Sequence, residues 1–465
     1  MHIRYTGQLK QIFRVAWLLL CLAPLYAGSQ NFKKTLSPIV LEDGDTFVFI
    51  GNSITHQCAY TQYVEDYFYT RYPNKRINLI NAGVSGDFAE HVLTRLDEDI
   101  LKHQPKYVSI LIGMNDGEYV KWQDSIFSTY KNSMTSLTNK LDKAKVKTIL
   151  LTPTIYDTQQ GLIGENWVEK EEVKDLHYDA VLSFFGAWCA EIAGLKGYGY
   201  ADLHGDLTHY TRMARKKDPN FTFVSDAVHP ENNGQLIMAL SFLKGIEANT
   251  TVSKILIDHK DGTWTYTAEN GMISSQSPTN IAFDFKANAL PWVVLNDAQM
   301  AFELAEAGSK MGQELLQVVG LEPGDYELMI DGSLVGTYSH LDFAAGVALQ
   351  NNEKTPQYQQ ALKVAQINKE RNEQIVERIR DEWLLRKGLE LGDEDEEEEE
   401  EEEDLVNDPD YQRYLRVRNM GLENYLKKEF YSVVGALESK SKTMVDAIYI
   451  ANQPKRHHYE IKRKL

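Results

Sequence analysis

The chain has 465 residues, of which 43% are hydrophobic, so it can bury a sizeable core and is long enough for two or more structural units. Its 67 acidic and 49 basic residues give a formal net charge of -18, and residues 393–404 alone, all Asp or Glu, supply twelve of the negative charges. This balance argues against nucleic acid as a partner, because binding to a phosphate backbone needs clustered Lys and Arg.

The first 27 residues have the three-part pattern of a secretory signal peptide. Basic residues between Arg4 and Arg14 precede an apolar run from Val15 to Tyr26, and small residues follow at positions 27–29. The run is too short for a comfortable membrane span, and no later stretch approaches the roughly 20 apolar residues that a span needs. We therefore expect an exported protein, periplasmic or extracellular, without a transmembrane segment.

Two cysteines remain after removal of that segment, Cys58 and Cys189. They allow at most one disulfide, which excludes a disulfide-scaffold fold. We expect both to be small, buried, apolar residues, and a bridge between them is the alternative.

Residues 44–246 alternate short apolar runs with amphipathic stretches, which is typical of strand-helix units repeated around a parallel sheet. The predicted strands are short and mostly apolar, as strands covered by helices on both faces should be. They are Thr46–Ile50, Ile77–Asn81, Tyr107–Ile112, Lys147–Leu151 and Tyr200–Leu203. Helical periodicity occurs at 57–72, 89–103, 123–145, 171–194 and 233–246.

The pattern changes after residue 250. Residues 250–350 contain short β-rich pieces, including Thr263–Ala268, Ile281–Phe285 and Tyr326–Ile330, with turn signals at Pro323-Gly324 and Asp331-Gly332. We predict a small β-containing accessory unit there.

The last region, residues 355–465, is charged and helical in pattern. We predict a helical hairpin whose connection is the acidic run 393–404, a solvated and mutually repelling loop that we expect to be disordered. The basic and apolar residues Tyr459–Leu465 are candidates to dock back onto the core, whereas His457 and His458 are interpreted as part of a polar chain end.

Ser53 is the candidate nucleophile. The predicted strand that includes Phe49 and Ile50 ends in Gly51-Asn52-Ser53, directly before a helical segment. A serine in that turn exposes its hydroxyl at the sheet edge, and its backbone N–H lies at a helix N-terminus that favours negative charge. The alternative is that Ser53 merely caps the helix.

Two further loops follow predicted strands. Gly86 lies in Asn81-Ala82-Gly83-Val84-Ser85-Gly86-Asp87, where a glycine lets a backbone N–H approach a ligand oxygen. Asn115 lies in Gly113-Met114-Asn115-Asp116-Gly117 and can offer its side-chain N–H to an oxyanion. Taken alone, each loop is weak evidence, because tight loops after strands use glycine and an Asn in a Gly-flanked turn is usually structural.

The fourth motif is Asp226-Ala227-Val228-His229-Pro230. Its spacing lets one turn of chain supply an imidazole that takes the serine proton and a carboxylate that orients the imidazole. A single Asp-x-x-His is weak evidence. In combination, the four motifs provide a nucleophile, three oxyanion donors, a base and the group that orients the base.

In this order and strand context the motifs resemble those of the SGNH hydrolase superfamily (GDSL-type), over roughly residues 44–246. The resemblance implies that Ser53 is the nucleophile, that Asp226 and His229 complete its triad, and that Ser53, Gly86 and Asn115 form the oxyanion hole. One departure is Gly51-Asn52-Ser53 in place of Gly-Asp-Ser, and we expect it to leave the chemistry intact because that aspartate is not the triad carboxylate. A flavodoxin-like three-layer α/β/α sandwich without metal or organic cofactor is implied.

The function expected from this resemblance and the export pattern is two-step ester hydrolysis, with O-acetylated carbohydrate as the leading substrate. A lipase or lysophospholipase acting on longer acyl chains is one alternative. A non-catalytic glycan-binding or scaffold protein of the same fold is the other, although none of the expected site residues is missing.

Three neighbouring side chains are weaker candidates. His56 would lie one helical turn beyond Ser53, so we interpret it as a helix-surface or pocket-lining residue rather than the base. Tyr119 and Trp122 follow the Asn115 loop, where residues commonly shape the pocket of such a sheet, and a structural role is the alternative for both.

Overall fold

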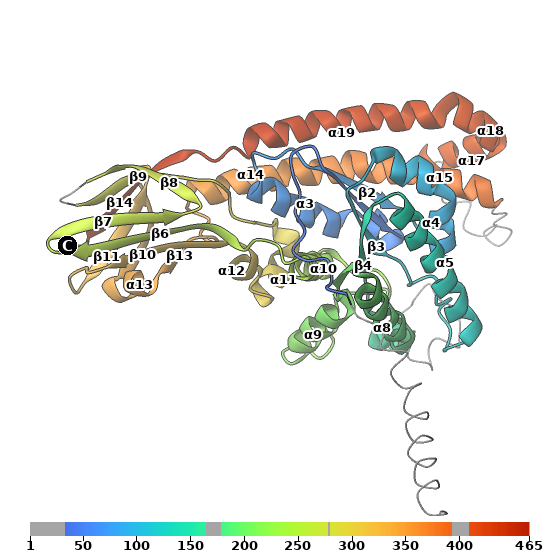
Figure 1. Ribbon diagram of the computed structural model, residues 1–465, viewed down its shortest axis with the longest axis horizontal. Coiled ribbons are helices and arrows are strands. Elements are labelled where there is room, and N and C mark those ends of the chain that lie inside the picture. The colour runs from blue at the N-terminus through green and yellow to red at the C-terminus, as the bar shows by residue number, and fades with distance from the viewer. Residues whose placement is uncertain (1–32, 164–177, 278–279, 393–408, 465) are drawn as a thin grey trace, which may run out of the picture.

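The computed structural model describes residues 33–163, 178–277, 280–392 and 409–464. Figure 1 shows a central α/β unit, a β-rich region at one end and a long helical hairpin that runs along one side of the α/β unit. The predicted signal peptide and the acidic run 393–404 lie outside the described residues, as do the first residues of the predicted helix 171–194. In the described ranges, no helix combines the length and the apolarity that a membrane crossing requires.

The central unit is built on a five-stranded parallel sheet with the order β2-β1-β3-β4-β5. Aromatic and β-branched residues suit a pleated strand buried on both faces, and the run Phe47–Ile50 is completely buried. The strands are β1 (Thr46–Gly51), β2 (Asn78–Gly83), β3 (Tyr107–Leu111), β4 (Lys147–Leu151) and β5 (Gly199–Ala201).

Helices cover both faces of this sheet. Helix α5 shows why, because its apolar side chains recur every three or four residues and are buried, whereas Lys131, Lys140 and Lys143 are exposed. Helices α3 and α10 pack together on one face, and α4, α5 and α8 lie on the other. The bounds are α3 (Ala59–Arg71), α4 (Ala89–Arg95), α5 (Asp124–Lys143), α6 (Thr158–Ile163), α8 (Tyr178–Lys196), α9 (Leu203–Arg215) and α10 (Asn232–Gly245). The predicted flavodoxin-like three-layer α/β/α architecture is confirmed.

Helix α9 is not among the sequence predictions, and the predicted strand Tyr200–Leu203 extends too far. The strand ends at Ala201 because Asp202 begins the helix, where its carboxylate accepts a hydrogen bond from the Gly205 N–H at 2.8 Å.

The β-rich region contains two sheets with the orders β13-β10-β6-β7 and β12-β11-β14-β9-β8. Apolar residues from both sheets form one common core, which includes Ile257, Phe283, Leu316, Leu328 and Tyr459. The strands are β6 (Thr251–Lys260), β7 (Thr263–Glu269), β8 (Gly271–Gln276), β9 (Ile281–Ala287), β10 (Gln313–Val319), β11 (Asp325–Ile330), β12 (Ser333–Ser339), β13 (Val347–Ala348) and β14 (Arg456–Arg463). Three short helices connect them, α11 (Gln299–Leu304), α12 (Ala307–Met311) and α13 (His340–Ala345).

The predicted turn at Asp331-Gly332 joins β11 to β12. Both residues have positive φ, 50° and 78°, the left-handed conformation that a tight hairpin turn requires and that Asp-Gly pairs favour.

The C-terminal helices form the hairpin predicted for residues 355–465. One arm consists of α14 and α15 with a π-helical turn between them, and α19 of the other arm packs against α14 and α15 (Figure 1). The helices are α14 (Pro356–Arg371), α15 (Glu377–Leu391), α17 (Pro409–Met420), α18 (Leu422–Tyr425) and α19 (Tyr431–Ala451). Helix α15 packs against β2, the edge strand of the central sheet, and Arg380 donates to the Asn81 carbonyl at 2.7 Å. The hairpin therefore covers an edge that would otherwise expose unpaired backbone groups.

The last helix, α19, ends at Ala451, and strand β14 follows it within the predicted helical region 355–465. Strand β14 lies between β9 and β11, and it buries Tyr459 and Ile461 in the core of the β region. His457 and His458 belong to this strand and contact Asp331 and Asp284 at 2.6 and 2.7 Å, rather than forming a polar chain end.

Glu314 on β10 is a buried acid at the junction of the β region and the hairpin. Its Oε1 accepts a hydrogen bond from Gln357 of α14 at 2.7 Å, and burial raises its pKa from 4.5 to about 7. Since the folded protein then holds this proton more tightly than the unfolded chain, this group lowers stability as the pH rises from about 4.5 through about 7.

We expect Glu314→Gln to remove that part of the pH dependence. Melting temperatures of the variant and the unaltered protein at about pH 5.5 and about pH 8.5 provide the measurement, and the variant should lose fewer degrees between the two. An equal loss in both proteins would show that Glu314 is not the responsible group.

Candidate active site

Ser53 lies directly after β1, at the carboxyl edge of the central sheet, where it begins the short helix α2 (Ser53–His56). Asn52 caps the helix with its side-chain oxygen. A Cβ at Gly51 would lie 1.9 Å from Thr55 Oγ1, so the close approach of strand end and helix requires a residue without a side chain. The local sequence thus fixes the turn that presents the Ser53 hydroxyl at the sheet edge.

Ser53, His229 and Asp226 form a continuous hydrogen-bonded group, named here the Ser-His-Asp group. His229 Nε2 lies 2.8 Å from Ser53 Oγ, and His229 Nδ1 lies 2.7 Å from Asp226 Oδ2. A carboxylate at Nδ1 favours the tautomer with the proton on that nitrogen, which leaves Nε2 able to accept the serine proton. The three side chains therefore have the relation of nucleophile, base and orienting group.

Asp226 is held by its own turn. Its Oδ1 accepts hydrogen bonds from the backbone N–H groups of Val228 and His229, at 2.9 and 2.7 Å. Burial raises the pKa of Asp226, but the His229 ring and these two amides lower it by more, so the net pKa lies below its ordinary value. The carboxylate therefore stays ionised well into acidic pH and can stabilise an imidazolium.

Gly86 and Asn115 line the same surface cleft as the Ser-His-Asp group, a hollow of about 460 Å³. Gly86 has a φ of 69°, the left-handed region that favours glycine. Asn115 is buried, donates from Nδ2 to the Asp87 carbonyl at 3.0 Å, and accepts from the Tyr119 hydroxyl at 2.9 Å. The structure thus brings together all five residues that the sequence analysis selected.

The weaker candidates separate. Tyr119 lines the cleft, whereas Trp122 lies in a different surface hollow, together with Phe127 and Phe184. His56 is buried, and its ring contacts Ser85 Oγ at 3.1 Å and Asp381 Oδ1 at 3.0 Å.

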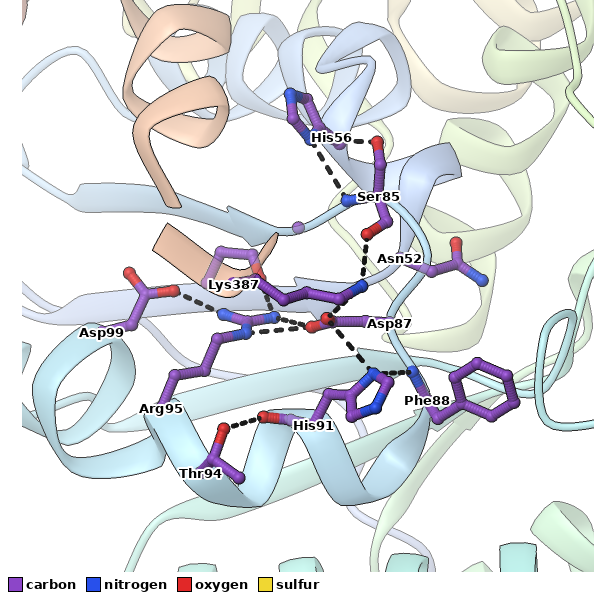
Figure 2. Close-up of polar contacts among 12 residues, drawn as sticks. Asn52, His56, Ser85, Asp87, Phe88, His91, Thr94, Arg95, Asp99 and Lys387 are labelled. Carbon is purple, nitrogen blue, oxygen red and sulfur yellow. Dashed lines mark hydrogen bonds and ion pairs between the residues drawn. The ribbon is translucent and has the colours of Figure 1, made fainter. Parts of the chain in front are cut away.

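A buried ionic network includes Asp87, the residue that follows Gly86 in the site loop (Figure 2). Asp87 accepts from Arg95 Nε and Nη2 at 2.9 and 2.7 Å, Arg95 also pairs with Asp99, and Arg380 Nη2 lies 2.8 Å from Asp99 Oδ2. Burial raises the pKa of Asp99, but the guanidinium groups of Arg380 and Arg95 lower it by more, so Asp99 is ionised. Since Arg380 lies on α15, the network joins the site loop to the C-terminal hairpin.

The sequence analysis assigned no role to Ser85, Asp87 or Lys387, which all contact this loop or form part of it. Ser85 and Asp87 flank Gly86 in the sequence, and this position is the signal that could have indicated their role at the site. Lys387 is separated from Ser85 by 302 positions, so no local pattern indicates their contact.

In the part of the chain that the structure describes, no group of three or more His, Cys, Asp or Glu side chains is arranged to hold a metal ion. Cys58 and Cys189 are both buried and are not joined to each other.

Residues 49–237 match the GDSL-like lipase/acylhydrolase family. An acetylxylan esterase from Geobacillus stearothermophilus is 24% identical over 225 residues, which are 44% of this chain and 94% of that relative.

Two solved structures are similar over different lengths. A gut microbial diltiazem-metabolizing enzyme is 26% identical, with a TM-score of 0.71 over 93% of this chain and 100% of that one. The acetylxylan esterase from Geobacillus stearothermophilus is 22% identical, covers 45% of this chain and 98% of its own, and has a TM-score of 0.36. The first similarity thus extends across the β region and the hairpin as well as the central unit.

Proposed function

We propose that residues 49–237, which match the GDSL-like lipase/acylhydrolase family, form a serine esterase domain. Ser53 is the nucleophile, His229 the general base and Asp226 the group that orients and stabilises the imidazole. The observation that carries the proposal is the unbroken contact from Ser53 Oγ through the His229 ring to Asp226, with distances of 2.8 and 2.7 Å.

The reaction proceeds in two acyl-transfer steps. As Ser53 Oγ attacks the ester carbonyl, its proton moves to His229 Nε2, and His229 then gives that proton to the alcohol that leaves. The acyl group remains on Ser53 as an ester. His229 next removes a proton from water, water attacks the acyl carbonyl, and the carboxylic acid is released as Ser53 regains its proton.

Three donors are available for the negative charge on the carbonyl oxygen in each step. They are the backbone N–H groups of Ser53 and Gly86 and the side-chain amide of Asn115. Donors that are fixed before the reaction stabilise this charge without having to reorient, which makes them a large contribution to rate.

Asn115→Ala is expected to lower turnover of p-nitrophenyl acetate by about 10²- to 10³-fold, because one oxyanion donor is lost. Asn132→Ala, at an exposed position on α5, is the control for a neutral amide deletion and should leave turnover unchanged. Steady-state rates are compared after melting curves show that both variants are folded. Unchanged turnover in Asn115→Ala would remove this side chain from the mechanism.

The substrate we propose is an O-acetyl ester of a carbohydrate. Support comes from the relative described as an acetylxylan esterase, which aligns over 94% of its own length. The 26% identity with a diltiazem-metabolizing enzyme over 93% of this chain favours a second candidate, a small ester that is not a carbohydrate.

A chain-length series tests the acyl preference. Hydrolysis of p-nitrophenyl acetate, butyrate and decanoate should fall steeply beyond acetate, after which acetylated xylo-oligosaccharides and diltiazem are compared as substrates by kcat/KM. A preference for decanoate would instead favour a lipase, and no hydrolysis of any ester would favour a non-catalytic binding protein.

We also propose that the protein is exported, on the basis of the basic, apolar and small-residue pattern of its first 27 residues. The protein purified from cells that produce it naturally should begin after that segment, and an N-terminal sequence that starts at Met1 would contradict export.

A further inference from the structure

Two side chains from distant parts of the sequence hold the loop Ser85–Asp87. One binds the backbone N–H of Ser85 and the other binds its carbonyl. The Ser85 backbone N–H donates to His56 Nδ1 at 3.2 Å, and the Ser85 carbonyl accepts from Lys387 Nζ at 2.7 Å. Figure 2 shows Lys387 reaching across to this loop. His56 Nε2 in turn contacts Asp381, and both Asp381 and Lys387 lie on α15. One arm of the hairpin therefore anchors the loop.

The contact with Lys387 fixes the orientation of the whole Ser85–Gly86 peptide unit, and not only that of the Ser85 carbonyl. The Ser85 C=O and the Gly86 N–H belong to one peptide unit, which is planar and trans, so the two bonds point in opposite directions. Glycine adopts positive and negative φ with similar ease, so the residue itself does not select one orientation of this plane. A hydrogen bond that holds the Ser85 carbonyl on the hairpin side thereby turns the Gly86 N–H away from the hairpin.

Asp87 links Lys387 to the second oxyanion donor, the side-chain amide of Asn115. Its backbone carbonyl accepts from Asn115 Nδ2 at 3.0 Å, and its carboxylate is fully buried between Arg95 and Lys387, with Lys387 Nζ 3.4 Å from Oδ1. The Lys387 side chain is itself only 15% exposed, so solvent screens this pair weakly. One lysine thus contacts the carbonyl that precedes Gly86 and the carboxylate of the residue that holds Asn115.

We propose that Lys387 is a positioning residue for the esterase reaction, which acts through the Ser85 carbonyl and Asp87 to orient the Gly86 N–H and the Asn115 amide toward the oxyanion. The inference rests on the proposed function and extends it, because Lys387 lies outside the family domain of residues 49–237. The C-terminal hairpin is then part of the machinery for turnover rather than an appendage to it.

Lys387→Met tests this proposal, because it keeps most of the aliphatic side chain and removes the ammonium group. We expect kcat on p-nitrophenyl acetate to fall by about 10- to 10²-fold with KM within about twofold, since a misdirected donor weakens an interaction made in the transition state. Lys387→Arg should recover much of the loss, because a guanidinium can donate to the same carbonyl. Lys440→Met, at an exposed lysine on α19, is the matched control and should behave as the unaltered protein.

The inhibition constant of a boronic acid is a second measurement, and it would not change if Lys387 had a purely structural role. The tetrahedral adduct of the boronic acid with the nucleophilic serine places an oxygen where the oxyanion forms, so the inhibition constant should rise in Lys387→Met by about the factor that kcat/KM falls. Melting curves show whether the variant is folded. If Lys387→Met does not fold, Lys387→Gln, which keeps a hydrogen-bond donor, takes its place with a smaller expected loss.

The outcomes separate the two proposals. A folded Lys387→Met protein with unchanged kcat/KM and unchanged boronate inhibition would overturn the positioning role and leave the proposed esterase intact. Absence of ester hydrolysis in the unaltered protein would overturn the proposed function and, with it, this inference.

Discussion

Replacing Ser53 by alanine is expected to lower ester hydrolysis by on the order of 10⁶-fold, which is the loss that follows when a serine hydrolase loses its nucleophile. The physical reason is that no other oxygen in the Ser-His-Asp group can form the acyl intermediate. His229, whose Nε2 lies 2.8 Å from Ser53 Oγ, would have only water to activate. Initial rates on p-nitrophenyl acetate, corrected for hydrolysis in buffer, give the measurement.

Ser85 provides a demanding comparison. It lines the same cleft, and its Oγ lies 3.1 Å from His56 Nδ1, while His56 Nε2 contacts Asp381 at 3.0 Å, so it also forms a serine-histidine-carboxylate arrangement. Because Ser85→Ala keeps the backbone groups that anchor the loop, its loss of rate should be far smaller than that of Ser53→Ala. A larger loss in Ser85→Ala would transfer the nucleophile to Ser85.

The largest expected effect on stability comes from Arg371→Met. Glu65 on α3 is fully buried, and its Oε2 accepts hydrogen bonds from Arg371 Nη1 at 2.9 Å and from Asn372 Nδ2 at 2.7 Å. Removal of the guanidinium leaves a buried carboxylate without a countercharge, which costs about 3–5 kcal/mol. Since this pair joins the central unit to the hairpin, the variant should also open that interface more readily.

Thermal and urea unfolding of Arg371→Met and of the unaltered protein measure this loss of stability, with Lys440→Met as the surface control. The double variant Glu65→Gln, Arg371→Met should recover part of the stability, because a buried pair contributes little once both charges are removed. A single variant as stable as the unaltered protein would contradict the stabilising role of the Glu65–Arg371 ion pair.

Sequence reasoning was most effective where strands end. Buried apolar runs such as Phe47–Ile50 predict strands of a parallel sheet, and the carboxyl ends of parallel strands meet at one edge. The loops that carry Ser53, Gly86 and Asn115 follow three neighbouring strands of that sheet, so their proximity follows from local pattern and topology together.

Strands and contacts that depend on partners far away in the sequence could not be predicted from local pattern. Strand β14 alternates buried Tyr459 and Ile461 with polar neighbours, but this short period-two pattern stands among basic residues and becomes a strand because β9 and β11 pair with it. The contact between Lys387 and the Ser85 carbonyl, like the network through Arg380, exists only because α15 packs against β2.

Covalent labelling of the unaltered protein with a fluorophosphonate, followed by peptide mass mapping, identifies the nucleophile without reference to substrate. The proposed mechanism predicts a single adduct on the peptide that contains Ser53, and loss of this adduct in His229→Ala, because the serine then has no base to accept its proton. An adduct on another serine, or none on the folded protein, would contradict the assignment of Ser53, His229 and Asp226 as the catalytic triad.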